Sequence, residues 1–284
     1  MKIIYKFSGA GNDFVVIDGR EGDVSAFREV PRIEALCKEF KTDGLMILGM
    51  PDQVGHDDGS TGSATVMADP DRPSVDFTME FYNPDGSGGM MCGNGGRCIV
   101  AFADYLGIKP ASGGVFLFMA PDGLHTGEIL ERPEDGLWTV RIKMIDVQGI
   151  TPMLGGYFLN TGTRHFVKFV EDVEQVDVDA EGKALRWNEA FAPIGTNVNF
   201  VHVAPDGLHV RTFEKGVEGE TLACGTGLTA CALVAHHAGV PTATPGAYRL
   251  RARQDWLSVN FTPGADEKFT DVYLTGPARL VEIR

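Results

Sequence analysis

The sequence has no hydrophobic run long enough to cross a membrane, because its apolar stretches fall short of the about 18 residues that a spanning helix needs. Its first segment, MKIIYKFSGAGNDF, lacks a long apolar region and a small-residue cleavage site, so we identify no signal peptide. Positive charge is scarce: 25 Lys and Arg stand against 39 Asp and Glu, a formal net charge of -14. Such a surface repels nucleic acid and anionic lipid. We therefore expect no nucleic-acid partner and no membrane partner.

Cysteine is also scarce, with five residues at positions 37, 92, 98, 224 and 231. An odd count without a signal peptide indicates free thiols in a reducing compartment, so we expect a cytoplasmic protein. No C-x-x-C pair occurs, which argues against a zinc site. The glycine-rich segment that begins at Cys92 lacks the Lys-Ser/Thr ending of a P-loop, which argues against a nucleotide site. We expect neither a metal nor a cofactor.

The 284 residues suffice for one large domain or two of ordinary size, and 43% hydrophobic residues are ample for a packed core. Helical spacing with an early proline predicts a helix over 31–40, and the polar, acidic segment 171–192 is predicted as a helix or a loop. Alternating or short apolar runs predict strands. These strands fall within 2–18, 46–48, 75–81, 115–119, 126–130, 137–145, 156–170 and 198–212, with a further edge strand in the loop-like segment 51–73.

An internal echo is the most informative feature of the chain. The tetrapeptide CGNG at 92–95 and the tetrapeptide CGTG at 224–227 each precede an apolar, helix-like run. Gly107 and Gly239 both follow their cysteine by fifteen residues, as expected for glycines that end a helix. The two copies are 224 − 92 = 132 residues apart, which is about the size of one domain. We therefore expect two similar halves, each with a cysteine beside a buried helix.

A cysteine at the start of a helix has a defined chemistry. The first turn leaves backbone N–H groups unpaired and carries partial positive charge. We expect this charge to lower the pKa of a nearby thiol, and the N–H groups to hold a carboxylate. If the halves face each other, Cys92 and Cys224 would stand on opposite faces of one α-carbon. One thiolate could then remove the α-proton while the opposite thiol delivers a proton, without metal or pyridoxal phosphate.

Six segments carry a family resemblance, and they occur in a fixed order along nearly the whole chain. They are GAGNDF at 9–14, YNPDGS at 82–87, CGNGGRC at 92–98, GTRH at 162–165, GTNVNF at 195–200 and FEKGVEGETLACGTG at 213–227. Together they resemble the diaminopimelate epimerase family. The resemblance implies an α/β (α+β) fold of two pseudo-symmetric domains, each a mostly antiparallel sheet or barrel around a central apolar helix. It also implies that the C-terminus returns to the first domain, so that one half comprises 1–143 plus 276–284 and the other 144–275.

The resemblance also implies the residues of the site. Cys92 and Cys224 correspond to the two acid–base groups of the family, and the glycine loops that follow them correspond to the carboxylate-binding segments. His165 lies inside a family motif and is a further candidate. The implied substrate-binding residues are Asn12, Asn83, Gly93, Asn94, Thr163, Arg164, Asn197, Glu214, Lys215, Gly225 and Thr226.

Two departures from the family pattern concern the far end of the substrate. Lys215 stands where the family usually has arginine, and Thr163 and Arg164 replace an Asn-Pro pair. Lysine cannot reproduce the two-pronged donor geometry of arginine. We hypothesise that Lys215 binds the distal carboxylate as a point charge, with Arg164 as an alternative source of compensation.

Several functions follow from these residues. The first is the cofactor-independent interconversion of L,L- and meso-diaminopimelate, with a small-molecule amino-acid substrate as the partner. The second keeps the mechanism but changes the substrate to proline, hydroxyproline or another amino acid. A thiol redox sensor with a Cys92–Cys224 disulfide is the third, although it gives the glycine loops no role. A non-catalytic amino-acid-binding protein is the fourth, although it would need no thiols. The oligomeric state stays open, with a homodimer as one option.

Overall fold

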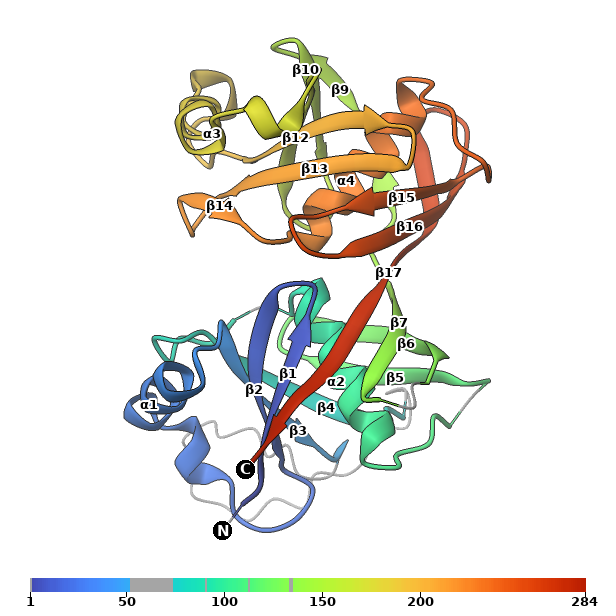
Figure 1. Cartoon of the computed structure of the whole chain (residues 1–284). Helices are drawn as coiled ribbons and strands as arrows, with labels where there is room; N and C mark the ends of the chain where they lie inside the picture. The colour runs from blue at the N-terminus through green and yellow to red at the C-terminus, as the bar shows by residue number, and fades with distance from the viewer. Residues whose placement is uncertain (1, 52–73, 90, 112, 133–134) are drawn as a thin grey trace.

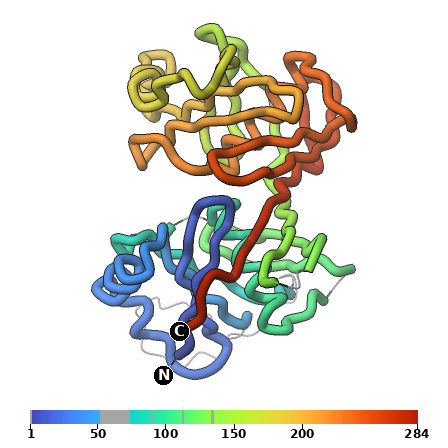
Figure 2. The backbone as a smooth tube through the Cα atoms, in the orientation of Figure 1, coloured from blue at the N-terminus to red at the C-terminus, as the bar shows by residue number. Residues whose placement is uncertain are grey.

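The computed structural model describes residues 2–51, 74–89, 91–111, 113–132 and 135–284. Figure 1 shows two halves, one above the other, which are connected by β17 (Lys268–Ile283) and by the segment after β7 (Leu137–Lys143). These two segments run side by side between the halves (Figure 2), where the Met144 N–H donates to the Val272 carbonyl at 2.8 Å. The edge strand expected within 51–73 lies outside the described residues.

The N-terminal half is a closed ring of eight strands around α2 (Gly93–Tyr105). Seven of the strands pair in sequence order, and β17 pairs with both β7 and β1 to close the ring. The residues of α2 from Gly93 to Ala103 are buried, so the helix forms the centre of the barrel. The other strands are β1 (Ile4–Gly9), β2 (Asn12–Asp18), β3 (Gly44–Gly49), β4 (Phe77–Tyr82), β5 (Val115–Ala120) and β6 (Gly123–Glu131).

The C-terminal half repeats this plan around α4 (Gly225–His237). The short β8 (Val147–Gln148) pairs with the first part of β17, which also pairs with β16. The next strand along the chain, β9 (Thr151–Met153), pairs with β10, so β8 and β9 together complete the ring. The remaining strands are β10 (Gly156–Asn160), β11 (Arg164–Phe169), β12 (Asn197–Ala204), β13 (Gly207–Glu214), β15 (Ala247–Arg251) and β16 (Trp256–Pro263), with β14 (Gly219–Thr221) as an extra ribbon beside β13.

The pairing pattern confirms that the two halves are repeats. In the first half the parallel pairs are β2/β3 and β4/β5, and in the second they are β11/β12 and β13/β15. Each parallel pair is connected through a helix, because parallel strands need a crossover. The outer helices α1 (Val30–Phe40) and α3 (Val178–Arg186) are equivalent, and so are the central helices α2 and α4. All other pairs are antiparallel, as expected.

Strand β17 belongs to both barrels. It pairs with β16 as far as Thr275, and from Gly276 it pairs with β7. Its end pairs with β1, where Ile283 lies opposite Tyr5. These pairings support the division into 1–143 plus 276–284 and 144–275, which we propose as the domain boundaries.

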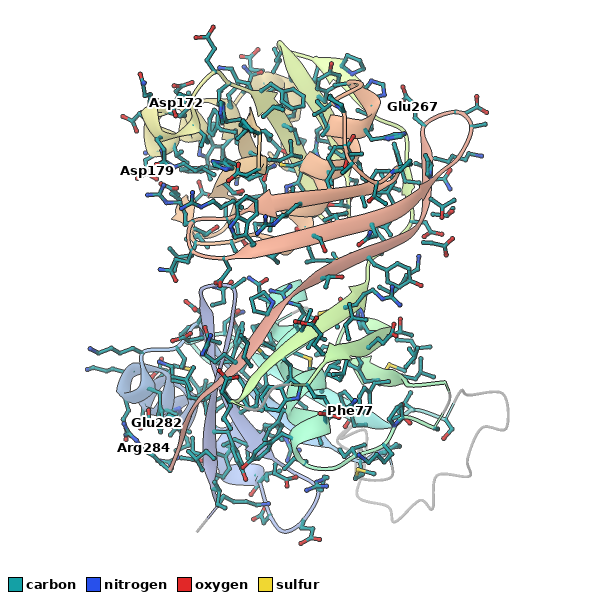
Figure 3. All side chains as sticks on the ribbon, turned by 45° about the vertical axis from the view of Figure 1, so that its right-hand side comes forward. Phe77, Asp172, Asp179, Glu267, Glu282 and Arg284 are labelled. Carbon is teal, nitrogen blue, oxygen red and sulfur yellow. The ribbon has the colours of Figure 1, made fainter. Side chains whose placement is uncertain are left out.

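The outer helices are held by their own apolar layers. Helix α1 has a proline near its start, as expected, and packs Ile33, Leu36 and Phe40 against β2 and β3. The segment 171–192 contains α3, whose first turn is capped by Asp177 accepting from the Ala180 N–H at 3.0 Å. Asp179 of α3, labelled in Figure 3, accepts from the Glu220 N–H at 2.9 Å and so connects α3 to β14.

The central helices differ from expectation in where they begin. We expected the glycine-rich segment to be a turn that leads into a helix. In the structure α2 begins at Gly93 and α4 at Gly225, so the glycines form the first helical turn. The other cysteines, Cys37, Cys98 and Cys231, are buried in the core. No helix in the described part of the chain is long and apolar enough to cross a membrane.

Candidate active site

Cys92 and Cys224 occupy the same position in the two repeats, because each is the N-cap residue of its central helix. The Gly95 N–H donates to the Cys92 sulfur at 3.2 Å. The Cys224 sulfur lies 3.5 Å from the Thr226 hydroxyl. Both thiols are therefore directed along the first turn of a helix, where backbone N–H groups are exposed.

The two helix N-termini meet at the boundary between the halves. A Cβ atom built on Gly225 would lie 3.6 Å from Gly93 Cα, and one built on Gly93 would lie 3.9 Å from Gly225 Cα. Leu274 of β17 lies beside both glycines, with its Cδ2 2.9 Å from a Cβ built on Gly225 and 3.2 Å from a Cβ built on Gly93. The absence of a side chain at both glycines permits this approach. The positive ends of two helix dipoles thus converge on one region, as an anion site requires.

Asn94 connects the two halves at this point. Its side-chain N–H group donates to Asn12 Oδ1 at 2.6 Å and to the Ala223 carbonyl at 3.2 Å. Its Oδ1 accepts from Arg97 Nη2 at 2.8 Å. Because a guanidinium only donates, this bond fixes which way the Asn94 amide is turned. Two residues expected in the substrate site, Asn12 and Asn94, are therefore brought together beside Cys224.

A second polar cluster surrounds His165, which is fully buried. Asn199 Nδ2 donates to the Phe166 carbonyl at 3.1 Å and lies 3.1 Å from His165 Nδ1, so this ring nitrogen is an acceptor. The proton therefore sits on Nε2, which lies 2.9 Å from the Thr163 hydroxyl and 3.0 Å from the Thr226 hydroxyl. Burial lowers the pKa of His165 to about 3, so the ring is neutral.

The expected distal residues form a third group. Asn197 donates to the Thr163 hydroxyl at 3.3 Å, and its Oδ1 accepts from the Lys215 backbone N–H at 2.8 Å. The Glu214 carboxylate accepts from the Thr221 hydroxyl at 3.0 Å. Burial raises the pKa of Glu214. Lys215 is exposed and forms no ion pair with a residue that the structure describes.

Two expected residues have contacts elsewhere. The Arg164 guanidinium lies over the Phe158 ring, 5.1 Å from its centroid, and donates to the Phe191 carbonyl at 3.3 Å. Neither contact is with an expected substrate-binding residue. The Asn83 side chain donates to the Ser87 hydroxyl at 3.0 Å, within its own turn.

The expected lowering of the thiol pKa values is wrong. Burial raises the pKa of Cys224 to about 12, and the negative charge of Glu214 acts in the same direction. The pKa of Cys92 is also raised. The Cys92 residue is exposed, yet desolvation by the surrounding protein is the largest cause of its raised pKa and outweighs the opposing hydrogen bond from the Gly95 N–H. The helix ends therefore do not replace the lost hydration.

Sequence reasoning assigned no role to two residues of this region. Arg97 orients Asn94, and Asn199 fixes the tautomer of His165. Both residues lie inside family motifs, Arg97 in CGNGGRC and Asn199 in GTNVNF, so the sequence did identify the segments that contain them. Their roles depend on contacts across the barrel, which spacing alone does not predict.

Comparison with known proteins assigns the chain to a family. The diaminopimelate epimerase family matches residues 157–281. The diaminopimelate epimerase of Chlorobaculum tepidum is 37% identical, with 96% of this chain and 97% of that protein covered. The enzyme of Aquifex aeolicus is 38% identical, with 96% and 93% covered.

Solved structures share the fold at low identity. A PhzF-family phenazine biosynthesis protein from Bacillus anthracis has a TM-score of 0.70 at 10% identity, covering 100% of this chain and 98% of that one. A probable proline racemase from Agrobacterium radiobacter has a TM-score of 0.61 at 14% identity, covering 100% and 92%. The fold agrees with these structures, and the identity to the curated relatives decides the assignment. The chain belongs to the diaminopimelate epimerase family.

Proposed function

We propose that the protein is a diaminopimelate epimerase that interconverts the L,L and meso stereoisomers, with Cys92 and Cys224 as its two acid–base groups. The observation that carries this proposal is that the two thiols cap facing helices of equivalent halves. The reacting carboxylate would bind to the N–H groups of both first turns, at Gly93 and Asn94 on one side and Gly225 and Thr226 on the other. Its α-carbon would then lie between the sulfurs.

The proton balance of this reaction is simple. One thiolate takes the α-proton and becomes a thiol, while the electron pair stays on the substrate and is spread into its carboxylate. The opposite thiol then protonates the other face and becomes a thiolate. No electron is transferred and no group is lost. The enzyme ends with its proton on the other cysteine, so exchange with solvent restores the starting form.

The raised pKa values suit this reaction. The α-proton of an amino acid is very weakly acidic, so a strong base is needed to remove it. A thiolate formed at Cys92 or Cys224 is a stronger base than an ordinary cysteine, because its pKa is raised. The cost is a smaller thiolate fraction before substrate binds. Helix ends that converge on the carboxylate stabilise the charge that develops during the reaction.

The distal amino-acid end of the substrate would be bound by Asn197, Glu214 and Lys215. The Arg164 guanidinium is engaged by Phe158 and Phe191, which leaves Lys215 as the cation for the distal carboxylate. Thr163 provides a hydroxyl beside Asn197. Asn12 and Asn83 would complete the substrate surface on the N-terminal side.

The alternatives explain fewer of these contacts. A probable proline racemase and a hydroxyproline epimerase share the fold at 14% and 15% identity. Neither proline nor hydroxyproline carries a second amino-acid end, so Glu214 and Lys215 would have no substrate group to bind. A redox sensor or a passive binding protein would need no neutral His165 held beside the Cys224 helix end. A cytoplasmic location and a homodimer stay predictions.

Isotope exchange tests the proposal. Reduced protein is incubated with L,L-diaminopimelate in deuterated water without added cofactor, and deuterium at the α-carbon is followed by mass spectrometry. We expect deuterium entry in the native protein and its loss in Cys92→Ala and Cys224→Ala. A parallel panel of stereopure proline, hydroxyproline and other amino acids tests the substrate. Undiminished exchange in both variants would exclude the two-thiol mechanism, and exchange with proline alone would exclude the proposed substrate.

A further inference from the structure

Arg97 is a fully buried cation that has only neutral hydrogen-bond partners. Its Nε donates to the Pro277 carbonyl at 3.3 Å, its Nη1 to the Gly93 carbonyl at 3.2 Å, and its Nη2 to Asn94 Oδ1 at 2.8 Å. No carboxylate in the described part of the chain forms an ion pair with it. A buried charge without a counter-ion lowers the stability of the folded protein, so we expect an anion to form or bind near Arg97.

The groups around Arg97 narrow the identity of that anion. Cys98, Cys92 and Asp255 are the ionisable groups that act on its charge, in that order. Cys98 is fully buried and its pKa is raised far above that of an ordinary thiol, so it stays neutral. Asp255 acts on Arg97 through its charge and forms no hydrogen bond or ion pair with it among the described residues. Cys92 remains, and it caps the helix whose first residue accepts a bond from Arg97.

Arg97 also determines the position of the helix start relative to the opposite half. Its bond to Asn94 Oδ1 turns the Asn94 N–H group toward Ala223, the residue before Cys224. Its bond to Pro277 ties the same helix turn to β17. A change at Arg97 would therefore disturb both the charge beside Cys92 and the alignment of the two helix ends.

We propose that Arg97 is a positioning residue of the epimerase site, which aligns the Asn94 bridge and compensates the negative charge that forms at the Cys92 thiolate and the bound substrate carboxylate. The carboxylate part of this assignment rests on the proposed function. The thiolate part does not, because it concerns a residue of the protein alone. The positive charge of Arg97 opposes the rise in the pKa of Cys92, whereas the negative charge of Glu214 adds to it.

Site-resolved alkylation tests the charge. Reduced protein is treated with iodoacetamide over a range of pH, and the rate at each cysteine is measured by peptide mass spectrometry. Arg97→Gln removes the charge and Arg97→Lys retains it. Arg141→Gln is the matched control, since Arg141 lies in the same half and pairs with Glu128. Isotope exchange with diaminopimelate is measured for the same variants.

For Arg97→Gln we expect Cys92 to react about tenfold more slowly at pH 8, which corresponds to about one unit of pKa. Cys224 and the Arg141→Gln control should keep their native rates. For Arg97→Lys we expect a nearly native alkylation rate at Cys92 but a lower kcat with little change in KM. Lysine keeps the charge but lacks the planar guanidinium whose N–H groups orient Asn94. A native Cys92 profile in Arg97→Gln would overturn the proposal.

The buried cysteines report a folding defect. If Arg97→Gln exposes Cys98 and Cys231 to alkylation, the structure has opened, and Arg97→Lys then decides. In that case a native alkylation rate at Cys92 together with a reduced kcat in Arg97→Lys supports the proposal. A changed alkylation rate at Cys92 or a native kcat in Arg97→Lys overturns it. If the native protein shows no isotope entry with any amino acid while Cys92 still depends on Arg97, the proposed function fails and the charge assignment stands.

Discussion

A methyl group at Gly225 would collide with Leu274, which packs against both of the helix ends on which the proposed reaction depends. The new Cβ would lie 2.9 Å from Leu274 Cδ2 and 3.6 Å from Gly93 Cα. Carbon atoms pack best at about 3.5–4.0 Å, so relief of the Leu274 contact alone requires a shift of about 0.6–1.1 Å. Leu274 is fully buried, which leaves it little room to move away.

This shift sets the size of the expected effects for Gly225→Ala. Overpacking of a filled core lowers the free energy of unfolding by about 1–3 kcal/mol. Misplacement of a reacting group by about 1 Å costs about a hundredfold in rate. We therefore expect a free energy of unfolding about 2 kcal/mol lower and a kcat reduced about 10- to 100-fold, measured by denaturant unfolding and deuterium entry.

Three further variants isolate the cause. Gly93→Ala meets the same Leu274 atom at 3.2 Å, so its effects should be smaller. Gly88→Ala has no heavy atom within 4 Å of the new Cβ and should behave as the native protein. Adding Leu274→Ala to Gly225→Ala should restore activity relative to Gly225→Ala alone, because it removes the clashing methyl. Native kcat and stability in Gly225→Ala would refute the tight packing of Leu274 against the helix ends.

Three other perturbations follow from the site. His165 has a folded-state pKa of about 3, below its unfolded value, so the stability that it contributes is present above pH 6.5 and is lost as pH falls. Urea unfolding should show a loss of about 2 kcal/mol between pH 6.5 and 5 that is absent in His165→Asn. Alkylation of Cys224, whose pKa is about 12, should accelerate up to pH 11 without the plateau near pH 9 of an ordinary thiol. Lys215→Ala should raise the KM for diaminopimelate about tenfold through loss of a charged contact, and an unchanged KM would exclude distal binding by Lys215.

The repeat could be predicted from the sequence because its signal is local. A cysteine, a glycine-rich turn and an apolar helix recur 132 residues apart, and the structure places Cys92 and Cys224 at equivalent helix starts. The closure of the two barrels could not be predicted from local sequence patterns. Each is closed by contacts between strands far apart in the chain, such as Ile283 with Tyr5, and no short-range pattern specifies such a partner.

The electrostatic state of the site was predicted with the wrong sign for a related reason. The helix-end effect on a thiol is a local property and can be inferred from the position of Cys92. Desolvation depends on everything that packs around the sulfur, and the charge of Glu214, from the opposite half of the molecule, raises the pKa of Cys92 further. At Cys92 and Cys224, which lie between the two halves, desolvation changes the thiol pKa more than the helix-end charge does.

The two repeats provide equivalent thiols, but their surroundings differ, and the difference suits an epimerase. At Cys92 the Gly95 N–H and the charge of Arg97 favour the thiolate. At Cys224 deep burial and Glu214 favour the thiol, and the Thr226 hydroxyl is the first group to oppose them. Because L,L- and meso-diaminopimelate are not mirror images, nothing requires the two faces of the site to be alike. The repeat provides a thiol at each of the two facing helix ends, and the unequal neighbours determine which thiol loses its proton more readily.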